Sequence, residues 1–424
     1  MPERATQQES TLGFFSLLAL GINGIVGVGI FFVPSKLATE VAGPAGIAVY
    51  LLTALGLLPV VHAFAVLGGR FEEDGGPYVW ARAALGPGVA FVVGWLVYVS
   101  ALFSAAAVVS GLSGHLASSW GLPEPWGTKG LAAACLLLLG GVAASGLRPS
   151  AVAWNLVTVL KLIPLLLMVV LFAAAPAPAS PAVVTSGLGW ESLSRGALIV
   201  VFALQGFEIV PVPAGKARHG RWAVPVATVS CLLLVAVLYA VLHWACIAAL
   251  PELGQSAAPI VDAARVLGGD AVASLVSVGT GVSAVGIAFG MMAMTPRYLS
   301  VLGRRDGFGA WVGLEHAASH VPRRALVITV ACVFTLVMWA TLRDLFVLSS
   351  VAVLTQYAAV VASLAVLGWR GAAGLRRRQL WSVPLALGAI LLLGRAAELY
   401  QLLVTAGVVL VGVVILLLRA RGTR

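Results

Sequence analysis

Long apolar runs are the feature of this sequence that most limits its fold. A helix that crosses a membrane needs about 20 consecutive apolar residues, and runs of this length recur throughout the 424-residue chain. Only 10% of the residues are charged, whereas a soluble globular protein carries about 25%. So few charges cannot cover a surface that faces water, which excludes a soluble enzyme. The 60% of hydrophobic residues excludes a disordered chain.

The apolar runs predict twelve membrane-spanning helices, so the expected fold class is an all-α polytopic membrane protein. The predicted spans are 12–33, 44–68, 78–113, 129–146, 150–175, 194–213, 224–250, 271–301, 325–341, 345–368, 380–394 and 401–418. Residues 176–193 are rich in proline and glycine and are interpreted as a loop. The first ten residues are polar and the first apolar run is long enough to span, so we expect no cleavable leader.

Lysine and arginine give the orientation, because the cytoplasmic loops of membrane proteins carry an excess of both. Among the 26 basic residues, Lys161 lies within a span, and most of the others fall on one predicted side. The opposite side holds only Lys36, Lys129, Arg195, Arg265, Arg343 and Arg395. We therefore expect a multi-pass protein of the inner (plasma) membrane with both termini in the cytoplasm. The net charge of +10 then reflects cytoplasmic loops, and we expect no nucleic-acid partner.

The loops between the predicted spans are too short to fold as separate domains, so any functional site lies within the membrane part. The four cysteines and six histidines are scattered, without the spacing of a metal site or a disulfide framework. His62, His115 and His243 lie near span ends and are interpreted as packing or interface residues. We expect no metal and no cofactor.

The first predicted span is interrupted by glycine. Gly21, Gly24, Gly27 and Gly29 crowd its middle, although glycine costs about 1 kcal/mol relative to alanine inside a helix. One interpretation is close packing against another helix through small residues. The other is a break in the helix at membrane depth.

The sixth predicted span carries a second interruption, which favours the interpretation as breaks. Gly206 and Glu208 lie at membrane depth, and Pro211 and Pro213 remove two backbone donors. These two spans open two five-helix halves, residues 12–175 and 194–368, and residues 380–418 add two helices. Broken helices in corresponding positions of two halves indicate a transporter site. No residue-level repeat relates the halves, so an inverted 5+5 repeat is inferred from topology alone.

A pair of broken helices has a specific binding chemistry. Unwinding frees backbone N–H and C=O groups near the middle of the membrane, where they are tolerated only if a ligand or water satisfies them. The N-terminal end of the second half-helix carries partial positive charge and suits a carboxylate. The freed carbonyl groups suit an ammonium. One such pair can therefore hold a zwitterionic amino acid without charged side chains.

Two charged residues are predicted inside the membrane. Lys161 lies about halfway along the fifth span, too deep to reach an interface easily. An intramembrane charge is expensive, and functional by default. Burial favours the neutral form of Lys161 and the protonated form of Glu208. Both are therefore candidates for coupling or gating, although Glu208 could instead pair with a nearby arginine at a helix end.

Four segments carry a resemblance to a known family. They are Gly27 to Phe31 with Pro34 after them, then Gly75 to Tyr78 with Gly86, Gly94 and Trp95, then Phe202 to Glu208 with Pro225, and finally Arg297 with Arg304 to Gly307. Each segment alone is a weak signal, but the four occur in family order. The chain resembles the amino acid permeases of the amino acid–polyamine–organocation (APC) superfamily.

The resemblance implies a leucine-transporter-type 5+5 inverted repeat, with the substrate held where the first and sixth helices break. Backbone amides near Gly27, Val28 and Gly29 would bind the carboxylate of an amino acid. Carbonyl groups of Ile25, Phe202 and Gln205, beside Gly206, would bind its ammonium group, and the Phe202 ring would cover it. Lys161 matches a lysine of sodium-independent members, located where related transporters bind sodium. Glu208 matches a carboxylate that some members use to respond to protons.

The chain also departs from the family pattern. The acidic residues and Asn-Pro pair that usually follow the sixth helix are replaced by Ala214, Gly215, Lys216, His219 and Gly220, and Gln205 stands where an apolar residue is usual. We expect a sodium-independent secondary transporter of amino acids, most consistent with neutral ones, that is proton-coupled or exchanges one amino acid for another.

The alternatives are an amino acid exporter or a polyamine carrier, and, in another class, a transporter-like amino acid sensor or partner-dependent subunit. An enzyme is disfavoured because no nucleophile–base set, metal cluster or pair of carboxylates is predicted at membrane depth. The sequence leaves the oligomeric state open.

Overall fold

The computed structural model describes residues 12–71, 73, 75–146, 151–175, 189–214, 217–306, 309–317, 319 and 321–422. The described chain is helical, and its β pairing is a single isolated bridge between Leu12 and Ala217. The α-helices are α1 Phe14–Ile25, α2 Val28–Glu40, α3 Ala45–Gly68, α4 Pro77–Leu85, α5 Pro87–Ser119, α6 Trp126–Ala144, α7 Ala151–Ala174, α8 Trp190–Leu204, α9 Gly220–Ala249, α10 Pro259–Asp306, α11 Ala310–Gly313, α12 Arg323–Trp339, α13 Leu342–Trp369, α14 Ser382–Gly394 and α15 Leu399–Gly422. Short 3₁₀ helices occur at η1 Phe207–Ile209, η3 Leu253–Gln255, η4 Ala372–Gly374 and η5 Arg377–Trp381.

The expectation of an all-α polytopic membrane protein is confirmed. Among the described residues, eight helices are long and apolar enough to cross a membrane, and the bent pair α1 and α2 adds a ninth. The described apolar part of α7 is shorter, and α12 and α14 have only 17 and 13 residues. The total of twelve spans therefore stays a prediction.

Two predicted boundaries were wrong, for local reasons. The predicted span 78–113 is two helices, α4 and α5, because Gly86 has φ +86° and ends α4. The predicted span 271–301 lies within α10 and begins just after the interruption of that helix at Gly269, which has φ +80°. α8 begins at Trp190, inside the predicted loop 176–193. Residues 176–188, Lys216 and the side chain of Val28 lie outside the described parts of the chain.

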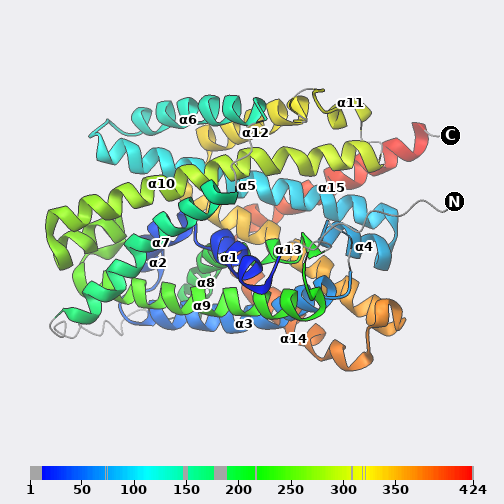
Figure 1. Ribbon diagram of the computed structural model, residues 1–424, viewed down its shortest axis with the longest axis horizontal. Helices are drawn as coiled ribbons and strands as arrows, with labels where there is room; N and C mark the ends of the chain where they lie inside the picture. The colour runs from blue at the N-terminus through cyan, green and yellow to red at the C-terminus, as the bar shows by residue number, and fades with distance from the viewer. Residues whose placement is uncertain are drawn as a thin grey trace.

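The broken helices occupy the middle of the bundle. In Figure 1, α1, α8 and α13 lie between a layer that contains α5 and α10 and a layer that contains α3 and α9. α3 packs along α9, α10 packs along α5, and α13 contacts both α5 and α8. Within this core the Phe64 ring packs edge-on against Trp80, Phe207 and Tyr357 at centroid distances of 5.4–5.6 Å. These aromatic contacts join α3, α4, η1 and α13.

Three of the arginines mark the two ends of α13. Arg370, just after α13, donates to the Ala84 carbonyl at 3.0 Å. At the start of α13, Arg343 pairs with Glu40, as does Arg195. α13 has 28 residues and is therefore about 40 Å long, so these two sets of contacts lie at opposite ends. This agrees with the predicted sorting of Arg195 and Arg343 away from Arg370, while the compartment that each end faces stays a prediction.

Glycine allows the two broken helices to touch backbone to backbone. A Cβ atom at Gly206 would lie 2.3 Å from the carbonyl carbon of Gly24, and one at Gly29 would lie 2.9 Å from the Cα atom of Ala203. Gly206 also has φ +119°, a conformation that residues with a side chain rarely adopt. The glycines therefore serve both as breaks and as the contact between the two breaks.

We predict that Gly206→Ala destabilises the fold by more than about 2 kcal/mol, because backbone strain and the overlap with Gly24 act together. The measurement is the midpoint of thermal unfolding in detergent. Gly56→Ala in α3 is the matched control, since no atom lies within 4 Å of the Cβ position there. An unfolding midpoint for Gly206→Ala that equals that of the control would contradict the close contact.

Candidate functional site

The first break separates α1 from α2. The Val26 N–H still donates to the Ile22 carbonyl at 2.8 Å, but Gly27 is extended, with φ −133° and ψ −158°. The chain bends by 45° across this segment. The last carbonyl groups of α1 and the first N–H groups of α2 consequently lack partners within a helix. No side chain caps the start of α2.

The second break separates α8 from η1. Gln205 is extended, and the left-handed Gly206 turns the chain into the short helix Phe207–Ile209. The Gln205 N–H donates to the Phe202 carbonyl across 3.4 Å, which is long for a backbone hydrogen bond. Both interruptions predicted from sequence therefore coincide with real breaks, and their glycines bring the two breaks together.

Lys161 binds the first break from α7. Its Nζ atom donates to the carbonyl oxygen of Asn23 at 2.8 Å and to that of Val26 at 2.7 Å. The side chain is completely buried, so it does not extend to an interface. The predicted intramembrane lysine thus provides hydrogen bonds to carbonyl groups that the break in α1 exposes.

Tyr239 of α9 binds the same break from another side, and sequence reasoning missed it. Its buried hydroxyl donates to the Ile25 carbonyl at 2.9 Å. This is one of the carbonyl groups expected to bind the ammonium of a substrate. A carbonyl oxygen has two lone pairs, so Ile25 can accept from Tyr239 and from one further donor. A lone tyrosine in an apolar span gives little signal before the packing is known.

Glu208 caps the second break. One carboxylate oxygen accepts from the Gly206 N–H at 2.8 Å and from the Tyr357 hydroxyl of α13 at 3.2 Å. The alternative interpretation, a carboxylate paired with an arginine, does not match these partners. Glu208 therefore satisfies a backbone donor that the left-handed turn would otherwise leave exposed in the membrane.

Side chains next to the second break connect it to α5 and α13. The Gln205 side-chain carbonyl accepts from Ser349 at 3.1 Å and from Ser104 at 3.4 Å, and the two serine hydroxyls lie 2.7 Å apart. The Phe202 ring stacks on Phe346 of α13, with centroids 4.2 Å apart. The break in α8 is thus held by polar contacts on one side and by stacked rings on the other.

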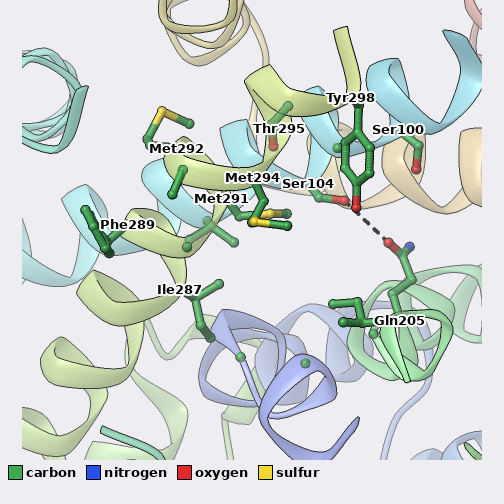
Figure 2. A pocket seen from close by; sticks show the side chains of 18 of the residues that line it. Ser100, Ser104, Gln205, Ile287, Phe289, Met291, Met292, Met294, Thr295 and Tyr298 are labelled. Atoms are coloured by element: carbon green, nitrogen blue, oxygen red, sulfur yellow. Dashed lines mark hydrogen bonds between the residues drawn. The ribbon is translucent and has the colours of Figure 1, made fainter. Parts of the chain in front are cut away.

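The two breaks open onto a cavity of about 570 Å³, well within the range of small-molecule sites. The predicted site residues with described side chains all line it; they are Ile25, Gly27, Gly29, Lys161, Phe202, Gln205, Gly206 and Glu208. Figure 2 shows its opposite wall, which α10 forms with Ile287, Phe289, Met291, Met292 and Met294. Sequence reasoning missed this wall, although half of the chain's six methionines lie within it.

Few polar groups line the cavity, and two of its charged side chains, Lys161 and Glu208, are hydrogen-bonded to other parts of the protein. Ser100, Ser104, Gln205, Thr295 and Tyr298 supply polar atoms in the part drawn in Figure 2. The only acidic residue among the described lining residues is Glu208, whose carboxylate has the partners described above. Within the described chain no three His, Cys, Asp or Glu side chains are placed to hold a metal ion.

The cavity extends toward one end of the bundle. Its lining continues from the breaks to Arg297 of α10 and to Pro322 before α12. At the opposite end Glu40 of α2 pairs through separate carboxylate oxygens with Arg195 of α8, at 2.8 Å, and with Arg343 of α13, at 2.5 Å. The Glu40 side chain is only 10% exposed. Ion pairs therefore join α2, α8 and α13 at one end of the bundle, while the cavity continues toward the other end.

Comparison with known proteins places this geometry in a family. A family model described as "Amino acid permease" matches residues 12–418. An uncharacterized transporter of Mycobacterium tuberculosis (strain ATCC 25618 / H37Rv) is 27% identical over 368 residues, which are 84% of this chain and 80% of that protein. The Methylthioribose transporter of Bacillus subtilis (strain 168) is 26% identical over 302 residues, 67% of this chain and 64% of that protein.

The Cationic amino acid transporter 4 of Mus musculus is 27% identical over 253 residues, which are 55% of this chain and 40% of that protein. The chain thus spans less than two thirds of the length of the mouse and Bacillus relatives. The match to the family model nevertheless covers nearly the whole chain and includes both breaks, Lys161 and the cavity. The protein belongs to the amino acid permease family, and its apolar helices make it a multi-pass membrane protein.

Proposed function

We propose that this protein is a sodium-independent secondary transporter of neutral amino acids in the inner membrane. The observation that carries the proposal is the pair of touching helix breaks on the wall of one cavity. The amides at Gly27, Val28 and Gly29 begin a helix that no side chain caps, and they suit the carboxylate of an amino acid. The carbonyl groups of Ile25, Phe202 and Gln205, beside Gly206, suit its ammonium group.

The charge of the cavity supports a neutral side chain. A cationic side chain or a polyamine needs an acidic partner in the membrane, and Glu208 already accepts two hydrogen bonds. The mouse relative is named for cationic amino acids and the Bacillus relative for methylthioribose. We favour neutral amino acids for this chain because its α10 wall is built from Ile287, Phe289 and methionines.

Lys161 is our candidate for coupling. Its ammonium donates to two carbonyl groups of the broken segment, and loss of its proton would replace these charge-assisted hydrogen bonds with the weaker ones of a neutral amine. Protonation would then change the stability of the break to which the substrate binds. Glu208 is positioned to act in the same way on the second break, through the Gly206 N–H. Exchange of one amino acid for another is the alternative to proton coupling.

The pairing at Glu40 supports alternating access. In the predicted orientation the Glu40 contacts close the outer side, and the cavity continues toward the cytoplasm. The conformation described here is then inward-facing. Reaching an outward-facing conformation requires Glu40 to separate from Arg195 or Arg343.

The proposal is tested with purified protein in liposomes that contain unlabelled amino acids. We predict saturable entry of labelled leucine, methionine or phenylalanine without sodium, and little entry of labelled arginine or methylthioribose. A pH gradient that speeds entry would identify proton coupling, and dependence on internal amino acid alone would identify exchange. Preferred entry of arginine, or stimulation by sodium, would contradict the proposal. Binding without entry would favour a sensor or a transporter subunit.

We predict that Lys161→Ala abolishes coupled uptake, because the Asn23 and Val26 carbonyl groups lose their charged donor. The measurement is the initial rate of uptake as a function of pH in liposomes. Lys129→Ala is the control, since Lys129 lies beside the Trp126 ring at the start of α6, away from the site. Full activity of folded Lys161→Ala with an unchanged pH profile would exclude this role.

We predict that Glu40→Gln increases access to the cavity from the outer side severalfold, because the charged pairs with Arg195 and Arg343 are lost. Access is measured as the labelling rate of Ala101→Cys, a cavity position, by a membrane-impermeant thiol reagent. Glu191→Gln is the matched control, since Glu191 is 84% exposed and pairs with Arg195. Equal labelling rates in both variants would show that the Glu40 pairs do not hold the outer side closed.

A further inference from the structure

Buried polar atoms without partners are concentrated at one helix contact outside the substrate cavity. The described residues contain seven such side-chain atoms. Four of them are the Tyr50 hydroxyl, the Thr53 hydroxyl and both ring nitrogens of His243. Tyr50 and His243 are completely buried, and Thr53 is 3% exposed. None of the three residues lines the substrate cavity.

The three residues lie on facing sides of α3 and α9. Tyr50 and Thr53 are three positions apart on α3, and Tyr239 and His243 are four positions apart on α9, so each pair shares one helix face. The Tyr50 ring lies 5.4 Å from the His243 ring and 6.1 Å from the Tyr239 ring, between centroids. Gly46, one turn before Tyr50, leaves room for the imidazole, because a Cβ there would lie 2.2 Å from Nε2.

The chemistry of this cluster identifies the ligand class. A buried polar group without a hydrogen bond destabilises a fold, and buried polar groups in native proteins are nearly always bonded to the protein or to ordered water. Hydroxyl and imidazole groups both donate and accept hydrogen bonds. No carboxylate joins them in the described contacts, and the described residues offer no metal-binding group there. A small neutral molecule that donates and accepts fits these groups, and water commonly fills such polar sites.

The cluster is connected to the broken helix. Tyr239, which contacts the Tyr50 ring, donates its hydroxyl proton to the Ile25 carbonyl at 2.9 Å. The Tyr50 ring lies between Tyr239 and His243, in contact with both rings. We propose that the α3–α9 contact encloses a water-binding site, formed by Tyr50, Thr53 and His243, that orients Tyr239 toward the first helix break. The site supports the break through residues that do not line the substrate cavity.

Hydroxyl-radical footprinting of the wild-type protein in ¹⁸O-labelled water tests the site directly, because buried residues beside bound water incorporate the label. Tyr98 is the internal control, since it is 2% exposed and its hydroxyl is bonded to Thr329 at 3.2 Å. We expect Tyr50 to be labelled at least severalfold faster than Tyr98. Equal labelling of Tyr50 and Tyr98 would overturn the proposal. This experiment does not depend on transport.

The direction in which the unfolding midpoint of Tyr50→Phe changes is a second test of the water site. Tyr50→Phe removes only the hydroxyl. If water bonds to that hydroxyl, the unfolding midpoint falls, as it does in the control Tyr98→Phe, which loses a direct hydrogen bond. If the hydroxyl is buried in a dry contact, its removal leaves the midpoint unchanged or raises it, and the water site is wrong.

The connection to the substrate site is tested by uptake, and this arm rests on the proposed function. Once wild-type uptake is established, Tyr50→Phe should raise KM roughly two- to tenfold, the size expected for one net hydrogen bond, with Vmax unchanged. Tyr98→Phe should leave KM unchanged. An unchanged KM for Tyr50→Phe would overturn the connection to Ile25. Absence of wild-type uptake would refute the transport proposal, while the footprinting result would still decide the water site.

Discussion

The structure depends on satisfying backbone groups that two broken helices expose inside a membrane. Water is scarce at that depth, so each freed N–H or C=O group needs a protein partner or a ligand. Three side chains from three other helices supply partners: Lys161 and Tyr239 at the first break, and Tyr357, through Glu208, at the second. The backbone groups that they satisfy therefore account for a lysine and a carboxylate inside an apolar bundle.

The same requirement explains the glycines. Two breaks can share one binding site only if their backbones approach closely, and Gly24, Gly29 and Gly206 permit this approach. The positive φ angle of Gly206 then points its N–H toward Glu208. Glycine content, helix breaks and the intramembrane carboxylate are therefore parts of one arrangement.

Sequence predicted those parts of the site that violate the rules of a membrane helix. Glycine clusters, a buried lysine and a carboxylate beside a left-handed turn are costly, so they stand out in an apolar chain. Tyr239 and the Ile287–Met294 wall of α10 were missed because apolar or amphipathic residues are unremarkable in a span, and only packing brings them to the cavity. The span 78–113 was wrong because a single residue, Gly86, ends α4 without interrupting the apolar pattern.

The partners of the first break are distributed unevenly around it. Lys161 and Tyr239 hold carbonyl groups at the end of α1, whereas the start of α2 has no side-chain cap and adjoins the cavity through Gly27 and Gly29. Donors from the protein thus stabilise the negative end of the break, whereas the positive end adjoins the cavity, where the carboxylate of the proposed substrate would bind. A second protein cap on α2 would make the break more stable and would remove the reason for a ligand to bind. The incomplete satisfaction of this one helix start is therefore what distinguishes a binding site from a kinked helix.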